Sequence, residues 1–261
     1  MTIVPALDII PLWFIFLSLC LVTCLALEAG YRFGKWRHNR APEEKDVPVG
    51  TMVGAILGLL AFMLAFTFSL AAARFDARRH MVLLEANAIS TTFLRTQLLP
   101  EAERSVSARL LREYVDIRIS GLTKQQLAAT IVRSEEIHGE LWTHAIRGVE
   151  KSPSPLTALY VQSLNQLIDL HAERVQVGIR SRIPLSLWGG LLLLAILGMA
   201  SIGYHSGLSA TRRSPEMLVL ILAFASVLYL IMDLDRPLEG LLLVSQQPMI
   251  DVQHLIHQNS P

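Results

Sequence analysis

Apolar residues are concentrated in four long runs along the chain. The runs cover approximately residues 9–29, 51–73, 184–204 and 216–232. A helix that crosses a bilayer needs about 20 mostly apolar residues. The pattern therefore predicts four transmembrane helices, arranged in sequence as two hairpins.

Between the second and third runs, over residues 74–183, apolar residues recur at helical spacing. A helix is expected to continue from the second run to Pro100, because nothing in residues 51–99 breaks it. At 1.5 Å per residue such a helix is about 70 Å long. The clearest linker is "KSPSP" at residues 151–155, and the helix from Leu156 is expected to run on into the third span. No strand pattern stands out.

The predicted fold class is thus an all-α membrane protein with a helical bundle domain between spans 2 and 3. We expect four parts: a first transmembrane hairpin (1–73), an extramembrane helical domain continuous with spans 2 and 3 (74–183), a second transmembrane hairpin (184–234) and an amphipathic C-terminal segment (235–261). The last segment is apolar enough to lie on a membrane surface or to dock on the helical domain, and we expect docking.

Composition supports a membrane protein. The sequence is 52% hydrophobic and 17% charged, against about 25% charged residues in typical soluble domains. Its net charge of +1 gives no indication of a nucleic-acid partner. Both cysteines, Cys20 and Cys24, lie in the first apolar run, which excludes a disulfide framework. Membrane lipid is the expected surrounding.

The distribution of basic residues predicts the orientation in the membrane. The two short loops carry Arg32, Lys35, Arg37, Arg40, Lys45, Arg212 and Arg213, and the N-terminal leader carries none. By the positive-inside rule these loops are cytoplasmic and the helical domain is extracytoplasmic. Arginines on the domain side nearly balance that count.

With four spans, the charged residues that flank spans 2, 3 and 4 on the domain side gather at one level. They are Arg74, Asp76, Arg78, Arg79, Arg180, Arg182, Asp233, Asp235 and Arg236. Carboxylates at a helix C-terminus are disfavoured by the helix dipole, so nearby arginines would compensate them. This charged collar is interpreted either as a set of ion pairs that fixes the helices or as a vestibule for ions.

The second span repeats small residues every fourth position, at Gly50, Gly54 and Gly58. The series continues one register over with Ala61, Ala65, Ser69 and Ala73. Small residues at this spacing let helices approach closely in lipid, within the hairpin or between subunits. Alternatively this helix lines a narrow pore, with Phe62, Phe66 and Ser69 as candidate pore or constriction residues, since apolar rings can gate by dewetting.

Other chemistry has little support. Glu135 and His138 form one Glu-x-x-His pair, whereas a di-iron bundle needs two such pairs and two more glutamates. No phosphate loop, nucleophile elbow or zinc spacing occurs, so no enzyme, metal or cofactor is predicted. Glu85 lies on or beside an apolar face and needs a partner. Arg174 and Arg112 are the candidates, and we predict a buried Glu85–Arg174 pair as a structural bond.

Several blocks carry a family resemblance. They are "GAILGLLAFMLAFTFSLAAARFDARRHMVLLEANAISTTFLRTQLLP" (54–100), "NQLIDLHAERV" (165–175), "RIP" with "LW" (182–188) and "DLDRPLEGLLLVSQQPMIDVQ" (233–253). The chain resembles the bestrophin-like membrane proteins of bacteria over about residues 50–253, and more loosely the bestrophins, which are pentameric anion channels. In those channels the second helix ends in an aromatic-Asp-Arg stretch that residues 73–79 partly match.

The resemblance implies a homo-oligomeric anion channel in a bacterial inner membrane, with span 2 lining the pore and small inorganic ions as permeants. Two features depart from true bestrophins: Ala77 and Arg78 replace their double tryptophan, and no acidic cluster like a calcium clasp is present. True bestrophins also keep the helical extension in the cytosol, opposite to the orientation predicted from charge. The alternative function is a non-conducting sensor or scaffold whose helical domain binds a partner.

Overall fold

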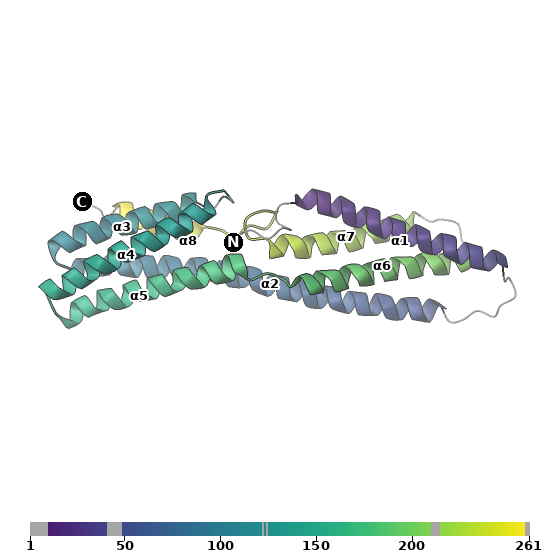
Figure 1. The fold of residues 1–261 in the computed structure, drawn as a ribbon, viewed down its shortest axis with the longest axis horizontal. Coiled ribbons are helices and arrows are strands. Elements are labelled where there is room, and N and C mark those ends of the chain that lie inside the picture. Colours follow the sequence, from purple (N-terminus) through teal and green to yellow (C-terminus); the bar gives the residue numbers. More distant parts are fainter. Residues whose placement is uncertain (1–9, 41–48, 122, 124, 210–214, 259–261) are drawn as a thin grey trace. The chain divides into compact units, whose positions relative to one another are not determined.

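The structure is a computed structural model that describes residues 10–40, 49–121, 123, 125–209 and 215–258. Every regular element in these ranges is a helix (Figure 1). The α-helices are α1 (Leu12–Arg40), α2 (Val49–Arg95), α3 (Glu101–Ser120), α4 (Leu127–Lys151), α5 (Pro155–Val175), α6 (Leu185–Leu208), α7 (Glu216–Asp235) and α8 (Gln247–Gln258). A 3₁₀ turn, η2 (Thr96–Leu98), follows α2, and a π-helical turn, η3 (Gln176–Arg180), follows α5.

Four helical segments are long and apolar enough to cross a membrane. They are Leu12–Arg40, Val49–Leu98, Pro155–Leu208 and Glu216–Asp235. The last three contain the second, third and fourth apolar runs, and the first contains the first run from Leu12 onward. The long helix after the first loop is present as the 47 residues of α2. The first residue of the predicted first span and the loop residues Lys45, Arg212 and Arg213 lie outside the described ranges.

The helix expected from Leu156 into the third span is not continuous. Helix α5 gives way to the π turn of η3, and residues 181–184 have no regular structure before α6 begins. Pro184 explains the restart. It disfavours helical geometry in the residue before it and has no N–H to donate, yet it is well tolerated at the start of a helix.

The chain forms two compact units, each described here by itself. We call residues 74–181 with 237–258 the polar unit, and residues 10–73 with 182–236 the apolar unit. The polar unit contains the second half of α2 together with α3, α4, α5 and α8. The apolar unit contains α1, α6, α7 and the first half of α2.

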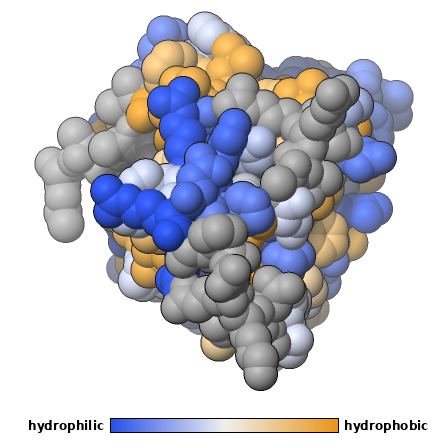
Figure 2. Space-filling model, turned by 90° about the vertical axis from the view of Figure 1, so that its right-hand side faces the viewer, coloured by the Kyte–Doolittle hydropathy of each residue, from blue (hydrophilic) through white to orange (hydrophobic). Residues whose placement is uncertain are grey.

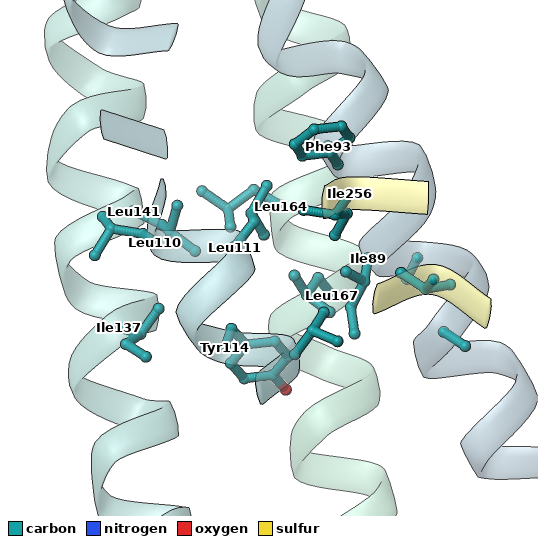
Figure 3. Packing of buried hydrophobic residues seen from close by; sticks show 14 of the residues in the cluster. Ile89, Phe93, Leu110, Leu111, Tyr114, Ile137, Leu141, Leu164, Leu167 and Ile256 are labelled. Carbon is teal, nitrogen blue, oxygen red and sulfur yellow. The ribbon is translucent and has the colours of Figure 1, made fainter. Parts of the chain in front are cut away.

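Large side chains fill the core of the polar unit. Figure 3 shows ten of them projecting from neighbouring helices toward one another: Ile89, Phe93, Leu110, Leu111, Tyr114, Ile137, Leu141, Leu164, Leu167 and Ile256. The last of these belongs to α8, which also buries Met249 and Val252 against this cluster. Gln253 fixes α8 to α3 by donating from Nε2 to Oδ1 of Asp116 at 2.7 Å.

Glycines set the packing in the apolar unit. A Cβ added at Gly30 would overlap the carbonyl oxygen of Ala200, and one at Gly203 would overlap that of Leu27. Gly34 and Gly207 are equally close to the facing backbone. Leu27 and Gly30 of α1 face Gly203 and Ala200 of α6, and further along both helices Gly34 faces Tyr204 and Gly207. The two helices therefore run in the same direction, as Figure 1 also shows. Close backbone approach through small residues is the usual packing of helices in lipid.

One end of the apolar unit is hydrophilic. Figure 2 looks onto the end at which α1 ends and α2 begins, and hydrophilic residues gather on this face. The last turn of α1 supplies Arg37, His38 and Arg40. The guanidinium carbon of Arg40 lies 4.4 Å from the ring centroid of Trp36, a cation–π distance. Arg37 and Arg40 are among the basic residues on which the orientation prediction was based.

Candidate functional sites

A carboxylate lies at the centre of the polar unit. Glu85, on α2, is completely buried. Arg118 of α3 donates from Nη2 to Glu85 Oε2 at 3.1 Å, and its Nε lies 3.0 Å from Oε1. Arg174 of α5 donates from Nη1 to the same Oε2. Two guanidinium groups from different helices therefore hold one carboxylate, which compensates much of the cost of burying these charges.

Further side chains complete this network. The hydroxyl of Tyr114 donates to Glu85 Oε1 at 2.5 Å and lies 3.1 Å from Nδ1 of His171. Nη2 of Arg174 donates to Oε1 of Gln246 at 3.0 Å, which ties the segment before α8 to the same centre. We call these six residues the Glu85 network; they are Glu85, Tyr114, Arg118, His171, Arg174 and Gln246.

Burial controls the ionisation of the groups beside Glu85. Desolvation and then the nearby carboxylate raise the pKa of the Tyr114 hydroxyl well above its ordinary value, so it stays a donor. His138 packs its ring against Tyr114 and His171, with centroids 5.0 and 4.9 Å away. Desolvation, with a smaller contribution from His171, lowers the pKa of His138 to about 4. His138 is therefore neutral at pH 7.

The structure brings Glu85 and Arg174 together, the pair predicted from the sequence. Sequence reasoning missed Arg118 and Tyr114. Their spacing of four residues places both on one face of α3, next to the buried positions Leu111 and Val115. A polar pair on the buried face of a helix was the signal that could have identified them.

The residues of the predicted charged collar are divided between the two units. Arg74, Asp76, Arg78, Arg79 and Arg180 belong to the polar unit, and Arg182, Asp233, Asp235 and Arg236 belong to the apolar unit. Within the first group Asp76, Arg79 and Arg180 are exposed, whereas Arg78 is buried. Within the second group both aspartates and Arg236 are buried.

In the apolar unit, the end of α7 binds the start of α6. Oδ1 of Asp235 accepts a hydrogen bond from the backbone N–H of Ile183 at 3.1 Å. The Arg182 guanidinium donates to the backbone carbonyl of Asp235. Arg236 donates from Nη2 to the carbonyl of Ile10, which precedes α1, at 2.8 Å. These contacts connect helix ends through backbone groups that no helix satisfies.

Gly54 and Gly58, on the small-residue face of α2, have no neighbour within the described part of the chain. A Cβ added at Gly54 or Gly58 would meet no atom within 4 Å. Phe62 and Phe66 are 66% and 54% exposed, and the other members of this face are exposed as well, namely Ala61, Ala65, Ser69 and Ala73. Gly50 differs, since a Cβ there would contact the ring of His205. The tight packing expected within the hairpin is therefore not made by Gly54 and Gly58.

The Glu-x-x-His pair does not form one site. Glu135 is exposed, whereas His138 is buried among the rings of the polar unit. Over the described ranges, no group of three histidine, cysteine or acidic side chains is placed to hold a metal ion.

In the described ranges every regular element is a helix, and four helical segments are long and apolar enough to cross a membrane. These features define a class of integral membrane protein, and comparison with known proteins identifies the family. The sequence matches the bestrophin-like domain over residues 12–249. The chain belongs to the bestrophin-like family. No curated protein sequence matches it.

Solved structures share the fold. A variant of the bacterial bestrophin homologue from Klebsiella pneumoniae superposes with a TM-score of 0.70 at 13% identity, covering 95% of this chain and 98% of that one. A second variant of that homologue gives a TM-score of 0.65 at 14% identity, covering 94% and 96%. The structure of the same homologue solved by zinc phasing gives 0.63 at 14% identity, covering 95% and 97%. At these identities the likeness concerns the fold alone.

Proposed function

We propose that this chain is one subunit of a homo-oligomeric bestrophin-like ion channel that conducts anions, with span 2 (residues 51–73) lining the pore. The observation that carries the proposal is the open face of α2. Gly54 and Gly58 meet nothing, and Phe62 and Phe66 are more than half exposed. A face of small residues interrupted by two rings is suited to surround an axis when several copies assemble.

In this proposal each chain crosses the membrane four times as two hairpins, residues 1–73 and 184–234. In the sequence the helical domain, residues 74–183, comes between the two hairpins, and the C-terminal segment, residues 235–261, docks on this domain. The face of α2 points to an axis shared by the copies, five of them by analogy with the bestrophins. Phe62 and Phe66 form the constriction, and Ser69 offers a hydroxyl one turn further along. Apolar rings at a narrow point can control water and ion passage by dewetting.

The charged collar supplies the mouth of the pore. Arg74, Arg79 and Arg180 belong to the same unit and outnumber Asp76, so their field favours anions at the entrance. Fields of this kind raise the local concentration of counter-ions and weaken as salt increases. The preference for anions rests on this excess of arginine.

Single-channel recording tests the proposal. The purified protein is placed in a planar bilayer of uncharged lipid with unequal KCl on the two sides. We expect a reversal potential on the chloride side, which moves toward zero in a double variant Arg74→Gln, Arg79→Gln. The matched control is Arg109→Gln, which removes an exposed arginine on α3 outside the collar. Silence from folded, oligomeric protein would refute the channel.

The constriction has its own test. Replacing Phe62 and Phe66 by alanine is expected to raise the unitary conductance, because the two rings leave the narrow point. Phe68→Ala is the control: Phe68 is also exposed, at 39%, but it lies on another side of α2. Equal effects of the two substitutions would place the pore elsewhere.

The orientation and the assembly are also open to measurement. We place the polar unit outside the cytoplasm of a bacterial inner membrane, on the charge of the short loops. A cysteine introduced at the exposed Thr143 of α4, with Cys20 and Cys24 replaced by alanine, would then react with an impermeant maleimide on spheroplasts. Reaction only after lysis would reverse the orientation. Native mass spectrometry gives the number of subunits.

A second function is favoured by one observation. Val132, Trp142 and Ile146 of α4 are exposed apolar side chains on the polar unit. Such side chains suit a helical domain that binds a partner, as in a non-conducting sensor or scaffold. That function predicts no current in the bilayer experiment and no effect of the collar arginines on ion selectivity.

A further inference from the structure

The segment between α7 and α8 exposes three leucines in a row. Residues 236–246 have no regular secondary structure, and within them Leu241, Leu242 and Leu243 are 80%, 39% and 56% exposed. A run of consecutive exposed apolar residues is unfavourable in water and usually marks an interaction surface. We call residues 240–243 the leucine tip.

Both ends of this segment are held on the polar unit. Val244 packs against the hydrophobic core of the unit, and Gln246 accepts a hydrogen bond from Arg174 at 3.0 Å. Nε2 of Gln246 donates to the carbonyl of Val244 at 3.1 Å. Residues from before and after the tip line one small pocket together with Arg118 and Arg174, namely Pro237, Leu238, Val244 and Gln246. The segment is therefore a loop that is fastened on both sides of its tip.

The backbone of the tip depends on a glycine. Gly240 has a φ of 128°, in a region that residues with a side chain rarely adopt. Leu238, before this glycine, lines the pocket, whereas Leu241, after it, is exposed. The fold thus keeps the ends of the loop on the unit and directs the leucines away from it.

The place of the loop in the chain indicates what surrounds the tip. Helix α7, which carries span 4, ends directly before Arg236. Arg236 bonds the carbonyl of Ile10, close to the exposed rings of Trp13 and Phe14 in the first turn of α1. Aromatic rings at the end of a span are typical of the membrane–water interface. Five residues of extended chain cover up to about 17 Å, so Leu241 can reach this interface from Arg236.

The backbone of the loop limits the depth that the tip can reach. A chain without helical hydrogen bonds is not stable in the hydrocarbon core facing lipid, because its N–H and C=O groups would lose water. In the interfacial region water still reaches the backbone, while apolar side chains contact the first part of the acyl chains. An irregular loop with exposed leucines therefore fits shallow insertion.

We propose that the leucine tip inserts into the interfacial region of the bilayer and that its partner is lipid. This contact extends the lipid-facing part of the chain beyond span 4. Through Gln246 and Arg174 it joins the bilayer to the Glu85 network. The proposal goes beyond the channel function and does not depend on ion conduction.

Fluorescence quenching in vesicles tests this contact. Cys20 and Cys24 are replaced by alanine, Leu243→Cys is labelled with nitrobenzoxadiazole, and the full chain is reconstituted into phosphatidylcholine. Separate samples contain iodide on both sides of the membrane or lipids that carry a nitroxide. We expect strong quenching by a nitroxide high on the acyl chain, weaker quenching by one near the end of that chain, and little quenching by iodide.

The matched control is Leu156→Cys, labelled in the same way. Leu156 is also a leucine of the polar unit with 56% exposure. It lies near the start of α5, whose 21 residues put about 30 Å between it and the end of the helix that leads to span 3. Its label should be quenched by iodide and not by the nitroxide lipids.

A second set of variants tests the leucines themselves. Leu241→Ser with Leu242→Ser, and the label at position 243, should lose quenching by nitroxide lipid and gain quenching by iodide, because the apolar side chains that favour the membrane are removed. Leu156→Ser with Leu159→Ser makes the same change at exposed positions on α5 and should leave both kinds of quenching at position 243 as they were.

Three results would overturn the proposal. Quenching of the Leu243→Cys label by iodide as strong as that at Leu156→Cys would place the tip in water. Protection from both quenchers would show that protein covers the tip, either a second copy of the chain or a partner. Lipid quenching that survives the serine substitutions would show that the loop is held at the membrane without its leucines.

Discussion

In the polar unit the space between helices is filled by whole side chains such as Tyr114 and Leu164, with Glu85 and two arginines at the centre. In the apolar unit the corresponding space between α1 and α6 is removed altogether, because Gly30, Gly203 and their neighbours let the backbones touch. The contrast follows from the surroundings. Water drives large apolar side chains together, whereas in lipid there is no such drive and close van der Waals contact takes its place.

The two kinds of core also treat polar groups differently. The Glu85 network joins side chains of three helices and the segment before α8. In the apolar unit Asp235, Arg182 and Arg236 bond backbone groups at helix ends, and Nη1 of Arg182 also lies 4.0 Å from Oδ2 of Asp235. We therefore expect the most damaging substitution in the polar unit to be the loss of a buried charge. In the apolar unit we expect it to be the addition of a side chain between closely packed helices.

The largest effect is expected at the centre of the polar unit. Glu85→Gln leaves Arg118 and Arg174 buried without their carboxylate, which typically costs about 3–5 kcal/mol of folding free energy. Denaturation of the full chain in detergent, followed by circular dichroism, measures this. The same substitution at Glu113 breaks a half-exposed pair with Arg133 and should cost no more than about 1 kcal/mol. Equal losses would show that the buried network does not hold the unit together.

The next effect is a dependence of stability on pH. The folded pKa of His138 is about 4, below the value of about 6.5 in an unfolded chain. Unfolding therefore takes up a proton between these values. The stability due to neutral His138 is complete above pH 6.5 and falls as the pH drops to about 4, by about 3 kcal/mol in total.

The His138→Phe variant should lose that part of the pH dependence in the same denaturation experiment, carried out between pH 4 and pH 7. His254→Phe, at an exposed position on α8, should keep it. An unchanged slope in His138→Phe would mean that another group takes up the proton.

The smallest effect is expected in the apolar unit, and it separates two glycines of the same helix. Gly203→Ala places a methyl group against the backbone of α1 and should cost about 1–3 kcal/mol. Gly189→Ala meets no atom within 4 Å and should stabilise α6 by up to about 1 kcal/mol, since alanine is the better helix former. Opposite signs in the thermal midpoint are the expected result. Two changes of the same sign would contradict packing through Gly203.

The sequence alone was sufficient to predict those features that follow from apolar length, from residues that end helices and from the cost of burying a charge. Length and apolarity identified the four spans, and Pro100 and "KSPSP" marked helix ends that the structure shows at the end of η2 and between α4 and α5. Along α5, where apolar residues recur at helical spacing, Tyr160, Leu164, Leu167 and His171 are buried, whereas Leu156 is exposed. Helical period, turn residues and the cost of an unpaired buried carboxylate are properties of the chain itself, and so Glu85 could be given a partner in advance.

Only the tertiary structure decided what each pattern is used for. Glycines spaced by four occur on α1, α2 and α6, yet those of α1 and α6 pack against each other while Gly54 and Gly58 of α2 stay open. Arg118 and Arg174 are far apart in sequence, and nothing local shows that both reach Glu85 or line one pocket. Contacts between helices depend on the rotation and register of every helix at once. They therefore cannot be deduced from the residues near any one position in the sequence.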